Sequence, residues 1–360
     1  MDRHKLGALL VSHLPNVRYL CGFTGSSGVL ALVAGKRPVL TFFTDGRYTE
    51  QASQEVVGTR VSVTSVGPLK SAAEWLQKAP RGPQVVGFEA EHTSVAARDA
   101  LAACFPKSTK LRPVAPLVER LRMVKEEAEI RQIRAAVNLA SGVYDSVVGD
   151  ITPGVLESSI AAELEYMCRR MGAEGMSFET IVASGQRSAL PHGKAANTAV
   201  AANGFVIIDF GVILGGYCSD MTRTVHVGAP KARSRRIYSA VLRAQLAGIK
   251  AVKAGIETVK VDQAARDVLE KEGLGAYFTH STGHGVGLEI HEAPGLRRRP
   301  TGRSQTKSGK VERLEAGMVV TIEPGVYLPG QGGVRIEDMV LVTESGCEVL
   351  TPNPKELIVL

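Results

Sequence analysis

The strongest constraint on the fold is a pair of apolar segments that flank two consecutive glycines within residues 205–227, FVIIDFGVILGGYCSDMTRTVHV. Two β-rich segments separated by Gly215-Gly216 predict an antiparallel hairpin with a two-residue loop. In that register Leu214 pairs with Tyr217. The loop therefore predicts which side chains of the two strands share a face.

Two aspartates project from one face of this hairpin. In the predicted register Gly211 faces Asp220, and Asp209 shares the face of Gly211 because strand side chains alternate with a period of two. Asp209 and Asp220 are then diagonal neighbours within reach of a common centre. Carboxylates are costly to bury unpaired among residues such as Val206 and Ile207, and a metal ion would remove that cost. The alternative is an acidic pair exposed at the end of the hairpin.

Three histidines lie close together in the later segment HSTGHGVGLEIHEAP, residues 280–294. They are His280, His284 and His291. The glycines between them argue against a helix and allow the backbone to approach a neighbour closely. A single histidine is usually a packed or exposed side chain, but three histidines in this context are candidates for metal or substrate binding.

Two glutamates lie in apolar segments near the C-terminal end of the sequence, within MVVTIEPGVYLPGQGGVRIEDMVLV. Glu323 ends one apolar strand before a proline, and Glu337 lies within another after a turn-rich segment. Unpaired carboxylates are rare among aliphatic residues. Arg335 shares the strand face of Glu337 and would be its salt-bridge partner in an alternative ion-pair network without metal.

Four carboxylates and at least one histidine on β elements predict an oxygen-rich metal site. Such a ligand set suits Mn²⁺, Co²⁺ or Zn²⁺ better than a thiolate-type site would. Carboxylates can also bridge two ions about 3.5–4 Å apart, the spacing used in hydrolytic two-metal sites.

The pattern along the chain predicts two domains. Residues 1–115 alternate short β-rich runs with helical stretches, which is typical of an α/β domain, and prolines punctuate a linker over residues 116–124. Residues 125–360 begin with an amphipathic helical pattern over 125–148 and read as a second domain with α+β character.

The second domain contains one order of elements twice. A helix, a glycine break, a shorter helix and a β-rich segment that ends at a histidine run from before Gly154 to His192, and again from before Gly255 to His291. This order predicts an internal pseudo-repeat. A doubled unit of this kind would place its site between the two halves.

The formal net charge of +7 is concentrated in one segment, residues 297–313. Its cations are offset there only by Glu312, and they are Arg297, Arg298, Arg299, Arg303, Lys307, Lys310 and Arg313. The remainder of the chain is nearly neutral, which argues against a nucleic-acid partner. We expect a solvated loop here, with a functional anion site as the alternative.

Cysteine content and hydropathy indicate the compartment. Five cysteines, an odd number without a C-x-x-C motif, argue against a disulfide framework and favour a reducing environment. No apolar run approaches the roughly 18 residues that cross a bilayer. We therefore expect a cytoplasmic protein without a membrane partner.

These segments resemble the creatinase/aminopeptidase P/prolidase family. The matching motifs are IIDFG followed by SDMTRT, TGHGVGLEIHEAP, and TIEPGVYLPGQGGVRIED, in the family's order. The earlier segments VRYLCGFTGSSG, FTDGRYTEQA and ALPHG are similar as well. The resemblance covers nearly the whole chain. It implies a catalytic domain with the "pita-bread" fold, preceded by a smaller α/β domain.

The resemblance also implies roles for individual residues. Two metal ions per chain would be held by Asp209 on one ion, His284 and Glu323 on the other, and Asp220 and Glu337 as bridges. The substrate site would be lined or supported by His192, His280, His291, Tyr327 and Arg335. The implied catalytic residues are His192, His291, Glu323 and Arg335.

The implied activity is hydrolysis of the Xaa-Pro bond of short proline-containing peptides, by a dipeptidase or an aminopeptidase P. Mn²⁺ is the expected metal, with Co²⁺ or Zn²⁺ as alternatives, and the expected assembly is a homodimer. A methionine aminopeptidase shares the fold and ligands but commonly lacks a domain like residues 1–115. Creatine hydrolysis uses this fold without metals, and a non-catalytic binding scaffold typically loses ligands, whereas this sequence retains the whole set.

Changing Arg297, Arg298 and Arg299 together to glutamine tests the basic segment. We expect KM and kcat for an Xaa-Pro dipeptide to change less than about twofold, because solvated cations contribute little net binding energy. Steady-state kinetics at low and high salt are the measurement. A several-fold rise in KM that weakens with salt, at unchanged kcat, would instead show that the segment attracts the substrate carboxylate.

Overall fold

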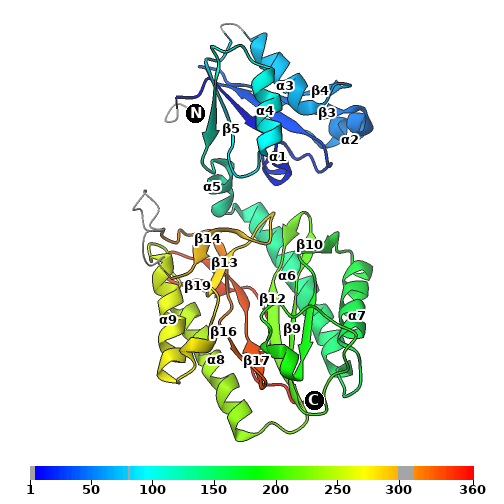
Figure 1. The fold of residues 1–360 in the computed structure, drawn as a ribbon, viewed down its shortest axis with the longest axis vertical. Helices are drawn as coiled ribbons and strands as arrows, with labels where there is room; N and C mark the ends of the chain where they lie inside the picture. Colours follow the sequence, from blue (N-terminus) through cyan, green and yellow to red (C-terminus); the bar gives the residue numbers. More distant parts are fainter. Residues whose placement is uncertain (1–4, 80–81, 299–311) are drawn as a thin grey trace. The chain divides into compact units, whose positions relative to one another are not determined.

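The computed structural model describes residues 5–79, 82–298 and 312–360, so most of the basic segment lies outside the described residues. The chain divides into two compact units, Met1–Arg122 and Met123–Leu360 (Figure 1). At the described edges of the basic segment, Arg298 pairs with Glu270 and Arg313 pairs with Glu257, both as exposed ion pairs. None of the helices in the described part of the chain has the length and apolar character needed to cross a bilayer.

The first unit is built on one six-stranded sheet with helices on both faces. The strand order is β4-β3-β2-β1-β5-β6, in which β1 pairs antiparallel with β2 and parallel with β5. The strands are β1 (Ala8–Val11), β2 (Val29–Val33), β3 (Val39–Asp45), β4 (Arg60–Thr64), β5 (Val85–Glu89) and β6 (Lys110–Val114). The helices are α1 (Leu14–Cys21), α2 (Thr49–Glu55), α3 (Pro68–Gln77) and α4 (Val95–Ala103).

Strand β1 shows why this sheet is covered on two sides. Leu9 and Val11 belong to the apolar cluster with α1 and α2, whereas Ala8 and Leu10 belong to the cluster with α3 and α4. A central strand with both faces buried reads as a continuous apolar run. The segment 116–124, expected as a linker, contains a short helix, α5 (Val118–Met123).

The described residues of the second unit form four long helices and several small sheets. The helices are α6 (Glu127–Val147), α7 (Glu157–Arg170), α8 (Ala232–Ala251) and α9 (Thr258–Lys271). The strands of its first half are β7 (Gly175–Met176), β8 (Ile181–Ser184), β9 (Gly204–Phe210), β10 (Val212–Leu214), β11 (Tyr217–Cys218) and β12 (Met221–Val227). Those of its second half are β13 (Gly283–Gly285), β14 (Glu292–Leu296), β15 (Val319–Ile322), β16 (Gly325–Leu328), β17 (Gly332–Arg335), β18 (Asp338–Val342) and β19 (Cys347–Val349).

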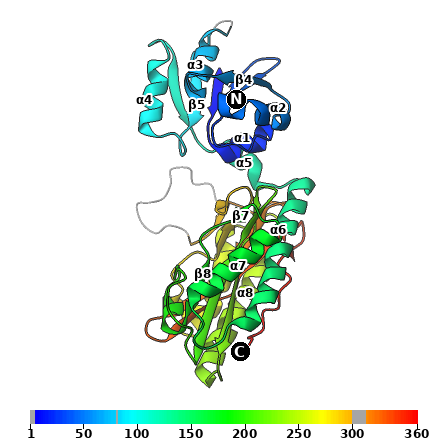
Figure 2. The same cartoon turned by 90° about the vertical axis from the view of Figure 1, so that its right-hand side faces the viewer.

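Each half of this unit packs a helix pair on strands, as the repeated order of elements predicts. In the first half, α6 and α7 share an apolar cluster with β8, β9 and β12. In the second half, α8 and α9 pack on strands of the C-terminal segment, including β15, β16 and β17. In Figure 1 the strands lie between the two helix pairs, and the view of Figure 2 places α6 and α7 in front of them.

The two-glycine loop fixes the register of the hairpin in the first half. Leu214 pairs with Tyr217 as predicted, and the same register continues to Asp209 opposite Thr222. Gly215 and Gly216 have φ values of 58° and 81°, the left-handed region that both central residues of a type I′ turn require. The hairpin register read from the sequence is therefore confirmed over its whole length.

Gly211 lies between β9 and β10, and its backbone closely approaches Ser219 on the opposite side of the hairpin. A Cβ atom at this position would lie 1.8 Å from the carbonyl oxygen of Ser219. The next residue after Ser219 is Asp220, so the absence of a side chain at Gly211 lets the backbone that carries Asp220 come close to the strand of Asp209.

Replacing Gly211 with alanine should destabilise the unit by about 3 kcal/mol or more, because the strands must separate to admit a methyl group. Gly142, inside α6, has open space around its Cβ position, so Gly142→Ala should instead stabilise by about 0.5–1 kcal/mol. Denaturant unfolding of the metal-free proteins measures both. A Gly211→Ala variant as stable as the wild type would show that the strands do not need this close approach.

Candidate metal centre

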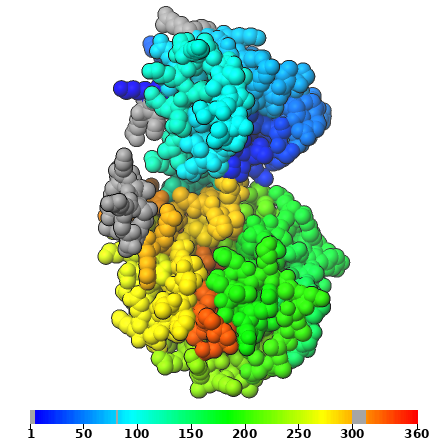
Figure 3. Space-filling model, in the orientation of Figure 1, coloured from blue at the N-terminus to red at the C-terminus, as the bar shows by residue number. Residues whose placement is uncertain are grey.

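The predicted site residues other than Tyr327 line one cavity of about 510 Å³ in the second unit. They are His192, Asp209, Asp220, His280, His284, His291, Glu323, Arg335 and Glu337. Both halves of the unit contribute, since Asp209 lies on β9, His284 on β13 and Glu323 directly after β15. In Figure 3 the green first half and the yellow second half meet along a line where orange-red residues of the C-terminal strands reach the surface.

The centre of the cavity brings together two carboxylates and one imidazole. One ligand atom from each of Asp220, His284 and Glu337 lies within 4.8 Å of the others. His284 Nε2 is 3.3 Å from a Glu323 carboxylate oxygen and 3.6 Å from an oxygen of Asp220. These distances are short enough for all four side chains to share a metal centre.

The hydrogen bonds of His284 fix its tautomer. Its Nδ1 lies 3.0 Å from the carbonyl oxygen of Gly285, which can only accept, so Nδ1 carries the proton. Burial lowers the pKa of His284, which keeps the ring neutral. Nε2 then presents a lone pair to the carboxylate oxygens of Asp220 and Glu323, an arrangement that is repulsive unless a metal ion or a carboxyl proton lies between them.

In two of the carboxylates, one oxygen accepts a hydrogen bond and the other is buried without a partner among the described residues. Asp209 Oδ2 accepts a hydrogen bond from Arg335 Nη2, and Glu337 Oε2 accepts one from Thr222 Oγ1 at 2.7 Å. The other oxygens, Asp209 Oδ1 and Glu337 Oε1, are buried without a hydrogen-bond partner among the described residues. Buried acceptors are rarely left unsatisfied, and metal coordination is a direct way to satisfy these two. The residues present therefore fit a divalent metal site.

The electrostatic environment of the site favours binding of a cation. Burial is the largest cause that raises the pKa of Asp220 and Glu337 well above the ordinary range, followed in both cases by repulsion from neighbouring carboxylates. Burial also raises the pKa of Glu323 to about 8. Arg335 is the positive group that lowers these pKa values, and it only partly offsets the excess of negative charge.

Arg335 pairs with Asp209 and not with Glu337, so the salt bridge suggested by the shared strand face is wrong. Asp209, on β9, contacts the guanidinium of Arg335, the last residue of β17, while the carboxylate of Glu337 is bound by Thr222. Arg335 Nη1 also donates to Tyr327 Oη at 2.6 Å. Tyr327 therefore lies behind Arg335 and supports its orientation.

A directed chain of hydrogen bonds continues from Tyr327 to His280. Nδ1 of His280 lies 2.8 Å from the Ser281 carbonyl oxygen and so carries the proton, which leaves Nε2 to accept from Tyr327 Oη at 2.9 Å. Burial lowers the pKa of His280 to about 4. His280 is therefore neutral, and both of its ring nitrogens are engaged by the protein.

The other two histidines occupy the open side of the cavity. His192 and His291 are exposed, and the ring of His291 contacts that of His284 edge-on with centroids 4.4 Å apart. Partial desolvation of the ring and then the neighbouring His284 lower the pKa of His291. Both histidines are therefore placed to meet a ligand that enters the cavity.

Sequence reasoning missed two threonines that hold the acidic residues. Thr222 binds Glu337, and Thr321 Oγ1 lies 3.2 Å from Glu323 while it accepts the backbone N–H of His284 at 3.0 Å. The signal was available, because each threonine lies two positions from a site carboxylate and so shares its strand face. An apolar wall of the cavity, made by Phe178, Ile181 and Ile290, was also missed, since nothing in its pattern separates it from ordinary core.

Comparisons with known proteins agree with this geometry. Residues 131–344 match metallopeptidase family M24, and residues 1–124 match the creatinase/prolidase N-terminal domain. An Xaa-Pro dipeptidase from Pyrococcus horikoshii is 36% identical over 358 residues, covering 99% of this chain and 96% of that protein. An uncharacterized peptidase of Bacillus subtilis is 40% identical over 355 residues, covering 99% of this chain and 96% of that protein.

Solved structures show the same architecture. An Xaa-Pro dipeptidase from Bacillus anthracis superposes with a TM-score of 0.91 at 42% identity and covers 100% of this chain and 96% of that one. An X-Pro aminopeptidase from Thermotoga maritima gives a TM-score of 0.88 at 35% identity, covering 100% and 99%. The chain belongs to metallopeptidase family M24, with a creatinase/prolidase-type N-terminal domain. The predicted α+β fold and family are confirmed.

The raised carboxyl pKa values predict how metal-free protein responds to pH. When the pKa of a carboxyl is higher in the folded state than in the unfolded state, the folded state binds more protons. The contribution of that carboxyl to the free energy of unfolding is then greatest at pH values below its unfolded-state pKa. For Glu323 that contribution is lost as pH rises from 4.5 through about 8. We expect the Tm of chelator-treated protein to fall over this range, and Mn²⁺ to restore it at the alkaline end because metals bind the deprotonated carboxylates.

The variants Glu323→Gln and Glu337→Gln are the controls, because an amide cannot titrate. Under chelation each should show a flatter Tm profile between pH 4.5 and 8 than the wild type, measured by scanning calorimetry. Identical slopes in wild type and both variants would mean that these carboxyls do not govern the pH dependence.

Proposed function

We propose that this protein is a two-metal peptidase that hydrolyses the Xaa-Pro bond of short peptides. The observation that carries the proposal is the set of half-satisfied carboxylates, Asp209 and Glu337, whose free oxygens share one cavity with the acceptor nitrogen of His284. The relatives named Xaa-Pro dipeptidase and X-Pro aminopeptidase support the choice of substrate.

The ligand assignment is the one that the family resemblance implies, and side chains with an unbound oxygen or nitrogen support it. Asp209 would hold the first ion through Oδ1, while Arg335 keeps its other oxygen in place. His284 and Glu323 would hold the second ion, and Asp220 and Glu337 would be shared between the two. Mn²⁺ suits four carboxylates with one imidazole, and Co²⁺ or Zn²⁺ would also bind such a set.

The substrate bond explains why metals are suited to this reaction. The bond before proline is a tertiary amide without an N–H group, so a site that must hydrogen-bond that N–H cannot use it. Two bound divalent ions would lower the pKa of a water molecule to near 7 and polarise the scissile carbonyl. The protein residues must then orient the peptide, stabilise the developing oxyanion and move one proton.

Residues on the open side of the cavity are suited to these tasks. His291 would donate a hydrogen bond to the developing oxyanion, and His192 would contact the peptide close by. Glu323, which lies in the same cavity 3.3 Å from His284 Nε2, would pass a proton to the proline nitrogen as it leaves. Arg335 orients Asp209 and completes the cavity wall.

Compartment and assembly belong to the same proposal. All five cysteines are free thiols, which supports a reducing, cytoplasmic environment. We propose a homodimer, in which a partner's N-terminal domain would close the pocket beyond proline in a dipeptidase and leave it open in an aminopeptidase.

Metal removal and substrate length test the proposal together. Dialysis against a chelator should abolish hydrolysis of Ala-Pro, and Mn²⁺ or Co²⁺ should restore it. Comparing Ala-Pro with Ala-Pro-Ala decides between dipeptidase and aminopeptidase activity. The control variant Asp220→Asn should lose at least one ion per chain by elemental analysis and nearly all activity, because a neutral amide is a weak bridging ligand.

Several outcomes would reject the proposal. Full activity in protein without measurable metal would exclude the metal centre. Release of methionine from peptides that lack proline, at rates above those for Ala-Pro, would favour a methionine aminopeptidase. Tight metal binding with no hydrolysis of either class would favour a non-catalytic scaffold.

A further inference from the structure

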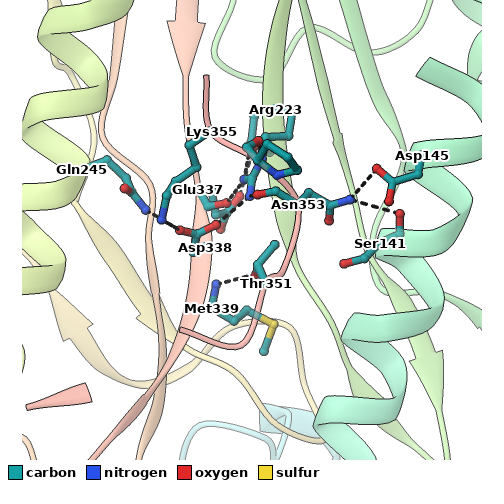
Figure 4. Close-up of polar contacts among 12 residues, drawn as sticks. Ser141, Asp145, Arg223, Gln245, Glu337, Asp338, Met339, Thr351, Asn353 and Lys355 are labelled. Carbon is teal, nitrogen blue, oxygen red and sulfur yellow. Dashed lines mark hydrogen bonds and ion pairs between the residues drawn. The ribbon is translucent and has the colours of Figure 1, made fainter. Parts of the chain in front are cut away.

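The guanidinium of Arg223, a residue of β12, lies next to the segment between β17 and β18 that contains Glu337 (Figure 4). Its side chain is only 2% exposed, yet it has a partner for each of the five N–H groups of a guanidinium. Nε donates to the Pro354 carbonyl, Nη1 to the carbonyls of Thr222 and Glu337, and Nη2 to Asp338 Oδ1 and the Asn353 carbonyl. A cation placed in this way is fixed in position and orientation.

Asp338 is the counter-charge of this cluster. Its side chain is fully buried and extends to the opposite side of the strand from Glu337. Oδ1 accepts from Arg223 Nη2 at 2.8 Å, and Oδ2 accepts from Gln245 Nε2 at 2.8 Å and from Lys355 Nζ at 2.5 Å. Removing the carboxylate would leave a buried guanidinium without compensation, which is strongly unfavourable.

Glu337 lies between β17 and β18, outside both strands, so it depends on other groups for its orientation. Its N–H donates to the Thr222 carbonyl at 3.1 Å, and its own carbonyl accepts from Arg223 Nη1. Its carboxylate is held through Oε2 by Thr222 Oγ1 at 2.7 Å. The consecutive residues Thr222 and Arg223 therefore fix both the peptide and the side chain, which directs Oε1 into the site.

The C-terminal segment 353–355 ties this cluster to helices from both halves. Asn353 Nδ2 donates to the Ser141 carbonyl and the Asp145 carboxylate on α6. The Lys355 carbonyl accepts from Tyr238 Oη on α8 at 2.9 Å. Figure 4 shows the contacts of Asn353 with Ser141 and Asp145 on one side of Arg223, and the contacts of Asp338 with Gln245 and Lys355 on the other.

We propose that Arg223 and Asp338 are positioning residues for Glu337, acting through its backbone and never touching metal or substrate. The inference rests on the proposed metal centre and adds residues that stand outside its ligand set. A purely structural ion pair would affect stability alone, whereas a positioning pair also determines metal affinity. Groups that orient a metal ligand typically change affinity by 10–100-fold when altered.

Arg223→Lys is the main test, because it keeps the charge opposite Asp338 but cannot reach the Glu337 carbonyl with the same fork of donors. We expect the Kd for Mn²⁺, measured by calorimetric titration of metal-free protein, to rise at least about tenfold. The visible absorption of the Co²⁺-loaded protein should also change, since the geometry of a bridging ligand is altered. The matched control is Leu164→Ala in the α7 core, which should lower Tm and leave both metal readouts unchanged.

A second variant, Arg223→Met with Asp338→Leu, removes both charges and keeps the test valid if the lysine variant fails to fold. Apolar replacement of a buried pair is often tolerated in stability, but methionine cannot donate to Glu337, so Mn²⁺ affinity should remain low. Wild-type protein that binds no Mn²⁺ would reject the metal centre itself. If the wild type binds Mn²⁺ and the folded variants bind it with Kd values within twofold of the wild type, the positioning role alone is rejected.

Discussion

Mutual repulsion among four buried carboxylates, Asp209, Asp220, Glu323 and Glu337, is the interaction around which the second unit is organised. One buried guanidinium, that of Arg335, offsets part of this charge. The remaining charge is tolerated because threonine hydroxyls hold Glu337 and Glu323 at fixed places around a shared space. The same repulsion that opposes folding of the metal-free chain gives the site its affinity for cations.

The surrounding scaffold holds these groups together against that repulsion. A type I′ turn at Gly215 and Gly216 sets one register that carries Asp209 and Asp220 to the same side, and the missing side chain at Gly211 lets their strands meet. Helix pairs on both sides bury the outer faces of the strands. Apolar burial thus supplies the free energy needed to keep like charges close.

Much of this could be read from the sequence because it depends on local rules. The hairpin register followed from two glycines, and the acids stood out because they interrupt apolar strands. The partner of Arg335 could not be read in this way, because its pairing with Asp209 joins residues 126 positions apart. Glu337 lies between β17 and β18, so strand alternation does not predict the loop geometry that turns its carboxylate to Thr222. Long-range contacts of this kind are decided by tertiary packing.

The division of the site between two halves of the chain has a consequence for how the protein acquires its metals. His284, Glu323 and Glu337 are synthesised well after Asp209 and Asp220, and neither half alone offers the full ligand set. A growing chain therefore cannot capture ions with native affinity until the late strands have docked on the early hairpin. Metal bound by the assembled site would then stabilise the folded chain after the two halves have docked, because binding to the folded state alone shifts the folding equilibrium.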